Sequence, residues 1–226
     1  RFIAEELLRG ELSSVDGFVC RGDVRVMGIV DAVMYAQTRS FERFCYPSRL
    51  PSPIQERMSV LAIQVIRGIG YDNGMFNIEM MYDARRDSIH VVEINPRMSV
   101  QFSDLFEKVD GTSGYDVHLM LASGREPVFR KGRGRHAVAA SFILRVFEDR
   151  LVLRIPRPAE VEPLRVAFPD LRLRWFCREG RRLSRDPQDA ESYRLGFVNL
   201  GANDDEELSR RFDRARSTLR VVLAST

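Results

Sequence analysis

Apolar and polar residues alternate along several stretches of the first hundred positions, and this pattern predicts strands paired as hairpins. Residues 13–35 are typical of a strand, a turn at Arg21–Asp23 and a second strand. Residues 75–83 and 88–96 show the same alternation on either side of a polar turn. The apolar start of the chain, residues 2–8, predicts another strand.

Helical spacing follows between these hairpins. In residues 54–70 apolar side chains recur every three or four positions, and Gly70 stands where the pattern stops. Residues 46–53 contain three prolines, which predicts a loop. Residues 114–124 predict a short helix with a glycine stop.

Beyond about residue 130 the sequence predicts a second group of short strands, followed by a C-terminal helix. We expect a hairpin turning at Glu148 and Asp149, and a strand–turn–strand unit over residues 171–184. A last strand precedes an Arg-rich helix that begins with acidic residues, which the helix dipole favours. The sequence thus predicts an α+β protein with a domain at 1–129, a linker at 129–136 and a small β-rich domain at 130–226.

Composition and charge argue against several classes of protein. The chain has 226 residues, 44% of them hydrophobic, and a formal net charge of +3. Basic residues are interleaved with acidic ones, whereas nucleic-acid binding needs a concentrated basic patch. Apolar runs stay shorter than the ~20 residues that span a bilayer. Three widely spaced cysteines without a CxxC pattern favour neither a disulfide framework nor a zinc site, and they suggest a reducing cytoplasm.

Polar side chains at alternate positions mark the strand at 88–96 as chemically unusual. Glu93, Asn95 and Arg97 fall on one face of a regular strand. In a hairpin centred on residue 86, Glu79 lies nearly opposite Glu93. Facing carboxylates repel unless a cation lies between them or they share a proton, and an all-oxygen set suits Mg²⁺ or Mn²⁺. Arg97 would offer a planar fork to a phosphoryl group. The other interpretation is a solvated hairpin face without a ligand.

The segment "FNIEMMYDARRDSIHVVEINPRMS" resembles the metal-binding strands of the ATP-grasp superfamily, which includes biotin carboxylase, carbamoyl phosphate synthetase and the amino-acid ligases. The resemblance implies that Glu79, Glu93 and Asn95 bind one or two Mg²⁺ or Mn²⁺ ions with ATP. It also implies that Arg97 is the catalytic arginine, which stabilises the transferred phosphoryl group and then an oxyanion.

The same resemblance implies a nucleotide site. Met81 and Val92 match the apolar positions that pack on adenine, and the segment containing Glu5, Glu6 and Leu8 matches the backbone that contacts the adenine edge. Leu12 stands where the family often has a glutamate near the ribose. The two lysines that hold phosphates in the superfamily are not matched, so we expect the N-terminal part of the enzyme to be absent and this chain to be its C-terminal lobe.

The implied activity is that of an ATP-dependent ligase. A carboxylate becomes an acyl phosphate, and an amine, expected to be an amino acid or peptide, then displaces phosphate. Ser99 and Gln101 continue the alternation past Arg97 and are candidates for contact with the acceptor carboxylate. The expected partners are small-molecule substrates and a possible second copy of the chain, with no nucleic acid and no membrane.

Three alternatives remain open at this point. One is a bicarbonate-activating enzyme similar to biotin carboxylase, although the stretch after Arg97 contains no glutamate that could act as a base. The second is a nucleotide-binding module without catalysis. The third is an RNA-binding β-domain in the Arg-rich C-terminal portion.

Overall fold

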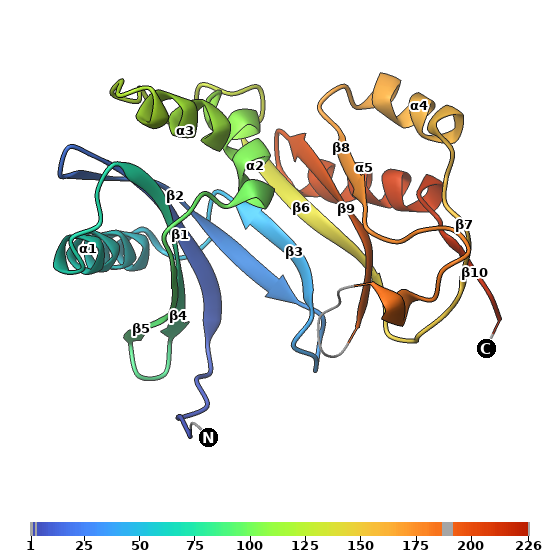
Figure 1. Cartoon of the computed structure of the whole chain (residues 1–226), viewed down its shortest axis with the longest axis horizontal. Helices are drawn as coiled ribbons and strands as arrows, with labels where there is room; N and C mark the ends of the chain where they lie inside the picture. Colours follow the sequence, from blue (N-terminus) through green and yellow to red (C-terminus); the bar gives the residue numbers. More distant parts are fainter. Residues whose placement is uncertain (1, 3, 187–191, 226) are drawn as a thin grey trace.

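A twisted antiparallel sheet of eight strands runs through the whole molecule, in the order β5-β4-β1-β2-β3-β6-β9-β8 (Figure 1). The computed structural model describes residues 2, 4–186 and 192–225. A separate two-stranded ribbon pairs β7 with β10. The strands are β1 (Glu11–Cys20), β2 (Asp23–Met34), β3 (Phe41–Tyr46), β4 (Gly74–Asp83), β5 (Ser88–Asn95), β6 (Val138–Val146), β7 (Val152–Arg154), β8 (Arg172–Trp175), β9 (Tyr193–Ala202) and β10 (Val222–Leu223).

Helices cover both faces of this sheet. On one face α2 and α3 bury Phe102, Phe106 and Val117 against the middle strands. On the other face α1 covers β1, β2 and β4, while α4 and α5 cover β6 and β9. The helices are α1 (Ser52–Gly68), α2 (Val100–Asp110), α3 (Gly114–Ala122), α4 (Pro158–Ala167) and α5 (Asp205–Thr218), with a 3₁₀ turn at Leu183–Arg185.

Both predicted N-terminal hairpins are confirmed. β1 pairs with β2 around Arg21 and Gly22, which both have positive φ (53° and 79°), as a two-residue hairpin turn requires. β4 pairs with β5 across the polar turn that precedes Ser88. The predicted helix at 54–70 is α1, and its buried side chains, Ile54, Met58, Ala62 and Ile66, lie four residues apart along one face.

Several predicted elements are wrong. The described residues before Gly10 form no strand, and Gly10 (φ 152°) lets this segment lie against β4, because a Cβ there would stand 2.1 Å from the Tyr82 carbonyl oxygen. The hairpin expected around Glu148 does not form, since β6 pairs with β3 and β9, and β7 pairs with β10. In residues 171–184 only β8 is a strand; the second half makes one isolated bridge, between Leu151 and Arg182.

A separate C-terminal β-rich domain is not confirmed. β3, from the first part of the chain, pairs with β6 from Arg43–Phe142 to Tyr46–Ala139, so the sheet is continuous across residue 130. Lys108 on α2 adds a second link, because its buried ammonium lies 2.8 Å from the Asp104 carboxylate and donates to the Asp170 backbone carbonyl (2.5 Å). The two parts of the chain therefore share one sheet.

Helix α3 begins with a capping box. Ser113 Oγ accepts from the Asp116 amide, and the Asp116 carboxylate accepts from the Ser113 amide (2.9 Å). We predict that Ser113→Ala lowers the free energy of unfolding by about 1 kcal/mol, because amide donors of the first turn lose their acceptor. Urea unfolding followed by circular dichroism measures this. Exposed Ser123→Ala, at the other end of α3, is the control and should change stability by less than ~0.5 kcal/mol; equal effects would contradict the capping role.

Candidate active site

The two carboxylates predicted to face each other do so. Glu79 on β4 and Glu93 on β5 are direct cross-strand partners, and the next pair on this face is Asn77 with Asn95. Glu79 is half-buried and Glu93 is exposed. Their side chains lie on the sheet face that carries α2, opposite the α1 face to which Ile78 and Met80 point. The hairpin thus presents two acids and two carboxamides side by side.

A β-bulge at Val92 changes the register beyond this point. Glu79 pairs with Glu93, but Met80 pairs with Val91, so Val92 is the extra residue of the bulge. As a result His90 pairs with Met81 and lies on the same face as Glu93. Strict alternation along the sequence would have placed His90 on the opposite face. Val92 itself is 47% exposed.

A chain of hydrogen bonds connects the sheet interior to the arginine. Asn77 Nδ2 donates to Asp16 Oδ2 (2.7 Å), Asn95 Nδ2 reaches Asn77 Oδ1 at 3.5 Å, and Arg97 Nη2 donates to Asn95 Oδ1 (3.1 Å). Asn77 Oδ1 thus accepts from Asn95, and Asn95 Oδ1 is turned toward Arg97. Asp16, only 2% exposed, orients the Asn77 carboxamide and, through it, that of Asn95.

The protonation of the acids follows from this arrangement. Burial first, and then the neighbouring charge of Glu93, raise the pKa of Glu79, while Arg97 acts in the opposite direction. Burial raises the pKa of Asp16 to about 8, despite the hydrogen bond from Asn77. A cation between Glu79 and Glu93 would remove the repulsion that raises the pKa of Glu79.

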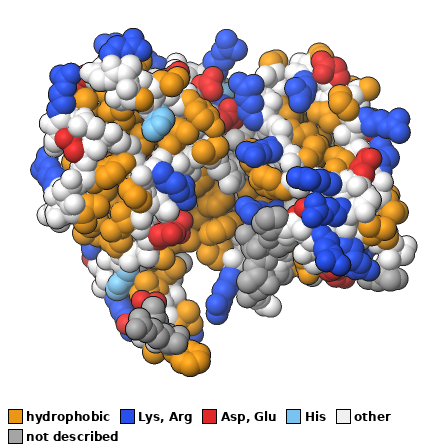
Figure 2. All heavy atoms as spheres, viewed as in Figure 1, with side chains coloured by type: hydrophobic (Ala, Val, Ile, Leu, Met, Phe, Trp, Pro, Cys, Tyr) orange, Lys and Arg blue, Asp and Glu red, His pale blue; other side chains and the backbone are white. Residues whose placement is uncertain are grey.

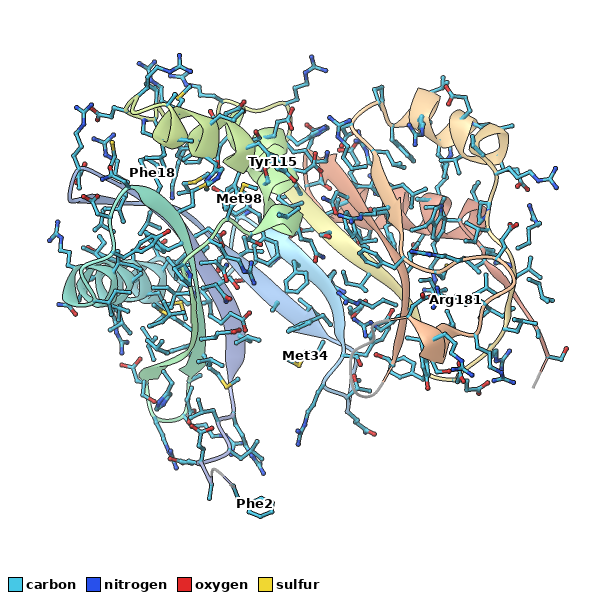
Figure 3. The ribbon with its side chains drawn as sticks, viewed as in Figure 1. Phe2, Phe18, Met34, Met98, Tyr115 and Arg181 are labelled. Carbon is cyan, nitrogen blue, oxygen red and sulfur yellow. The ribbon has the colours of Figure 1, made fainter. Side chains whose placement is uncertain are left out.

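A cavity of about 540 Å³ opens beside these groups. Figure 2 shows a hollow in this face of the molecule, with hydrophobic side chains on its floor and basic side chains along its right side. The wall from β4 and the β5–α2 segment carries Glu79 and Arg97, and Met98, labelled in Figure 3, lies at the start of α2. The other lining residues are Phe41, Phe44, Asn77, Ser99, Val100, Gln101, Phe102, Ile143, Arg145 and Arg194.

The predicted substrate residues both line this cavity, but not as an extension of the strand. Ser99 is the N-cap position of α2, and Gln101 belongs to its first turn. Gln101 Nε2 donates to Ser141 Oγ on β6 (2.9 Å), and Asn199 Nδ2 contacts the Gln101 carbonyl oxygen at 3.4 Å. The predicted alternation past Arg97 is therefore wrong, although the same residues reach the same site.

Two of the five predicted nucleotide residues line a second cavity, of about 550 Å³, at the far end of β4. Glu6 and Leu8 line it, with Glu6 ion-paired to Arg86 (2.8 Å). Met81 lies on the face of β4 that carries Glu79, two residues nearer to this cavity. Glu5 and Val92 are exposed and do not line it. His90 does line it.

The donor set fits a hard divalent cation. Among the described residues no group of three or more His, Cys, Asp or Glu side chains is close enough to hold an ion, so the site has only two carboxylates, with the Asn95 oxygen beside them. Few protein ligands, all of them oxygens, are typical of Mg²⁺ sites completed by phosphate oxygens and water. The direct pairing of half-buried Glu79 with Glu93 is the observation that a cation would explain.

Part of the chain matches a known family of ATP-binding domains. Residues 46–126 match the family model described as "Carbamoyl-phosphate synthase L chain, ATP binding domain". The C-terminal section of the carbamoyl phosphate synthase large chain of Methanopyrus kandleri is 32% identical over 80 residues, which are 34% of this chain and 15% of that protein. Over residues 46–126 the chain is therefore similar to the ATP-binding domain of ATP-grasp enzymes.

Solved ATP-grasp structures share the fold over nearly the whole chain. Phosphoribosylglycinamide synthetase from Anaerococcus prevotii and L-amino acid ligase from Bacillus licheniformis each match with a TM-score of 0.77 and 16% identity over 97% of this chain. The biotin carboxylase domain of the Hydrogenobacter thermophilus 2-oxoglutarate carboxylase, solved with MgADP and bicarbonate, matches with a TM-score of 0.69 and 14% identity over 95% of this chain. The chain spans 55%, 53% and 46% of these three structures.

Some residues of the candidate site were not singled out from the sequence. Asp16 and Asn77 lie 61 positions apart and meet only because β1 pairs with β4. Arg145 and Arg194 reach the cavity from β6 and β9. The "NIE" triplet, with an amide two positions before Glu79, was the one local signal that could have identified Asn77.

None of the helices in the described part of the chain is both long and apolar enough to cross a membrane.

Proposed function

We propose that this chain is part of an ATP-dependent ligase that joins a carboxylate to an amine through an acyl phosphate. The observation that carries the proposal is the direct pairing of Glu79 with Glu93 beside the Arg97–Asn95 hydrogen bond. Two acids, a carboxamide oxygen and a guanidinium on one sheet face suit a metal–triphosphate complex. The ATP-grasp fold, and the amino-acid ligase among its matches, support this class of reaction.

The reaction has two steps. A carboxylate oxygen of the first substrate attacks the γ-phosphorus of ATP, the bond from that phosphorus to the β,γ-bridging oxygen breaks, and ADP leaves. The amine nitrogen of the second substrate then attacks the acyl carbon, the C–O bond to phosphate breaks, and the amine loses a proton. The products are an amide, ADP and inorganic phosphate.

The residues of this chain position and neutralise the reacting groups. Glu79, Glu93 and Asn95 would hold Mg²⁺ or Mn²⁺, which supplies neutralisation of the phosphate charge. Arg97, tied to Asn95, is placed to donate to the transferred phosphoryl oxygens and later to the oxyanion at the acyl carbon. Asp16 and Asn77 keep the Asn95 oxygen turned toward the site.

ATP would lie along β4. The cavity lined by Glu6, Leu8 and His90 is at one end of the strand, and the cavity lined by Glu79 is at the other. Met81 lies between them on the same face, and two residues of a strand cover roughly 6.6 Å. This arrangement supports adenine at the first cavity and the terminal phosphates at the second.

Bicarbonate activation is the second candidate, favoured by the match to a biotin carboxylase domain solved with bicarbonate. The chemistry of the described wall supports it less well. Gln101 and Ser141, which are hydrogen-bonded to each other, have neutral side chains and supply no base for bicarbonate. We therefore prefer an organic carboxylate.

The remaining features of the proposal concern the whole protein. We infer a cytoplasmic enzyme, in which the buried, unbonded Cys20, Cys45 and Cys177 stay reduced. We propose that residues 1–129 act as the ATP-grasp lobe and that residues 130–226 complete the substrate cavity. Small-molecule substrates, and a possible second copy of the chain, are the proposed partners.

The test is phosphate release from Mg-ATP by the full-length protein that carries this chain, with pools of amino acids added. We expect release that requires one pool, together with an equal amount of ADP and a new amide product detected by mass spectrometry. The proposal fails if every pool leaves release at the ATP-only background while Mg-ADP still binds. Release that depends on bicarbonate alone would favour the second candidate.

A further inference from the structure

Three phenylalanine side chains form an apolar floor, here called the phenylalanine floor, in the cavity that holds Glu79 and Arg97. Phe41 and Phe44 come from β3, and Phe102 comes from the first turn of α2. The ring centres of Phe41 and Phe44 are 4.9 Å apart, and those of Phe44 and Phe102 are also 4.9 Å apart. Rings at these distances are in contact, so the three side chains make one continuous surface.

A β-bulge turns Phe41 toward the cavity. Phe44 pairs with Ala32 on β2 and lies on the sheet face that carries α2. Strict alternation would place Phe41, three residues earlier, on the opposite face. Glu42 is the extra residue of a bulge, however, so Phe41 pairs with Met34 (labelled in Figure 3) and lies on the same face as Phe44. The strand thus departs from regular pairing where it brings a second ring into the cavity.

Aliphatic side chains extend the phenylalanine floor. Ile143 on β6, the strand beside β3, lines the same cavity. Val100, the first residue of α2, also lines it and is 51% exposed. Figure 2 shows the hydrophobic side chains at the bottom of the hollow. Phe41 and Phe44 are only half-buried, so apolar surface faces the open cavity, and a ligand that covers this surface gains free energy by removing it from water.

The phenylalanine floor is continuous with the reacting end of the cavity. Residues 97–102 begin with the arginine proposed to bind the phosphoryl group and end with one ring of the floor. Gln101 Nε2 fixes this segment by donating to Ser141 Oγ on β6 (2.9 Å). β4, which carries Glu79, and β3 are three places apart in the sheet order, about 14 Å at a spacing of ~4.8 Å per strand. An acid whose carboxylate lies at Arg97 can therefore extend its organic group onto the floor.

We propose that the phenylalanine floor binds the side chain of the carboxylate substrate and so selects acids that carry an aromatic or large aliphatic group. The carboxylate then lies at Arg97, where it attacks the γ-phosphorus of ATP, while the side chain covers the rings. Small or polar acids leave the rings in contact with water and are activated less efficiently. The inference rests on the proposed ligase function and names the substrate class of its first step.

The first part of the test uses the unmodified full-length protein, with hydroxylamine in place of the amine substrate. The hydroxylamine nitrogen attacks the acyl carbon of the acyl phosphate, the C–O bond to phosphate breaks, and the nitrogen loses a proton. The hydroxamate product is measured by the absorbance of its iron(III) complex. Leucine is compared with asparagine, which has nearly the same shape, and 3-phenylpropionate with propionate. We expect kcat/KM to be about 10- to 100-fold higher for the acid with the larger apolar group, because that group is buried.

The second part removes one ring with Phe41→Ala. Tyr115→Ala is the matched control, because Tyr115, labelled in Figure 3, is 50% exposed on α3 and does not line the cavity. We expect Phe41→Ala to lower the ratio of kcat/KM for the apolar acid over the polar acid about 10-fold, and Phe41→Leu to keep most of this ratio. Tyr115→Ala should leave the ratio unchanged. Circular dichroism melting curves check that each variant is folded.

The two proposals fail in different ways. If no acid, the pooled amino acids included, gives a hydroxamate while Mg-ADP still binds, the ligase function is wrong, and this inference falls with it. If hydroxamates form but polar and apolar acids have equal kcat/KM values, the ligase function stands and the selection of apolar acids is wrong. A higher KM for ATP in Phe41→Ala, with an unchanged ratio, would assign the floor to the nucleotide base and also overturn the inference. The comparison on the unmodified protein decides the question even if Phe41→Ala unfolds.

Discussion

Glu93→Gln is expected to lower the rate of amine-dependent phosphate release at least 100-fold in the full-length protein. The substitution keeps the shape of the side chain but removes one of the two charges that face each other at Glu79 and Glu93. A metal that neutralises phosphate charge contributes several kcal/mol to the transition state, and each 1.4 kcal/mol is a tenfold change in rate. Steady-state rates at several Mg²⁺ concentrations measure the loss.

The Mg²⁺ dependence separates a metal role from a structural one. We expect Glu93→Gln to need more Mg²⁺ for half-maximal rate, whereas Glu56→Gln, on the exposed surface of α1, should match the unmodified protein. Loss of one carboxylate also removes the repulsion at Glu79, so the folded variant should be no less stable. Full activity of Glu93→Gln at unchanged Mg²⁺ demand would refute the metal site.

Asp16→Asn is expected to abolish a loss of stability, of several kcal/mol, that the unmodified protein undergoes as the pH rises. The pKa of Asp16 is about 8 in the folded chain and near 3.8 without burial. Between these two pH values the folded protein keeps the proton on Asp16, whereas the unfolded chain has lost it. The free energy of unfolding therefore falls as the pH rises from about 4 to about 8. One pKa unit corresponds to about 1.4 kcal/mol. Asparagine carries no charge, so this decline disappears.

Urea unfolding of the two proteins at pH 5, 7 and 9 measures the difference. Relative to the unmodified chain, Asp16→Asn should gain stability as pH rises, and the carboxamide oxygen can still accept from Asn77 Nδ2. Asp213→Asn, at an exposed position of α5, is the control and should give a parallel pH curve. Parallel curves for Asp16→Asn would show that its carboxyl is ionised in the folded chain across this range.

Local sequence spacing predicted the pairing of Glu79 with Glu93. Glu79 and Glu93 are related by a short hairpin, whose register follows from the turn and the alternation of its strands. The bulge at Val92 was not predictable in this way, since an extra residue leaves no mark in the pattern of apolar residues around it. It is the reason why His90 lies on the face opposite to the one that alternation implies.

Other misses have different causes. Helix α2 was not predicted, although its apolar residues have helical spacing: Phe102, Leu105, Phe106 and Val109. This pattern follows directly after the strand that ends at Asn95, and only the strand was predicted there. By contrast, Arg145 and Arg194 meet through strand pairing between distant segments, as do β7 and β10. Pairings of high sequence separation depend on the whole topology, which no local pattern encodes.

The β3–β6 pairing has a consequence for how the protein is made and dissected. These strands lie about a hundred residues apart in the chain, so during synthesis β3 stays unpaired on one side until β6 has been produced. A fragment that stops near residue 130 would keep this open edge, with the side chains of Phe41 and Phe44 beside it. Such edges are templates for aggregation. Expression of the N-terminal part should therefore extend beyond β9, which covers the other side of β6.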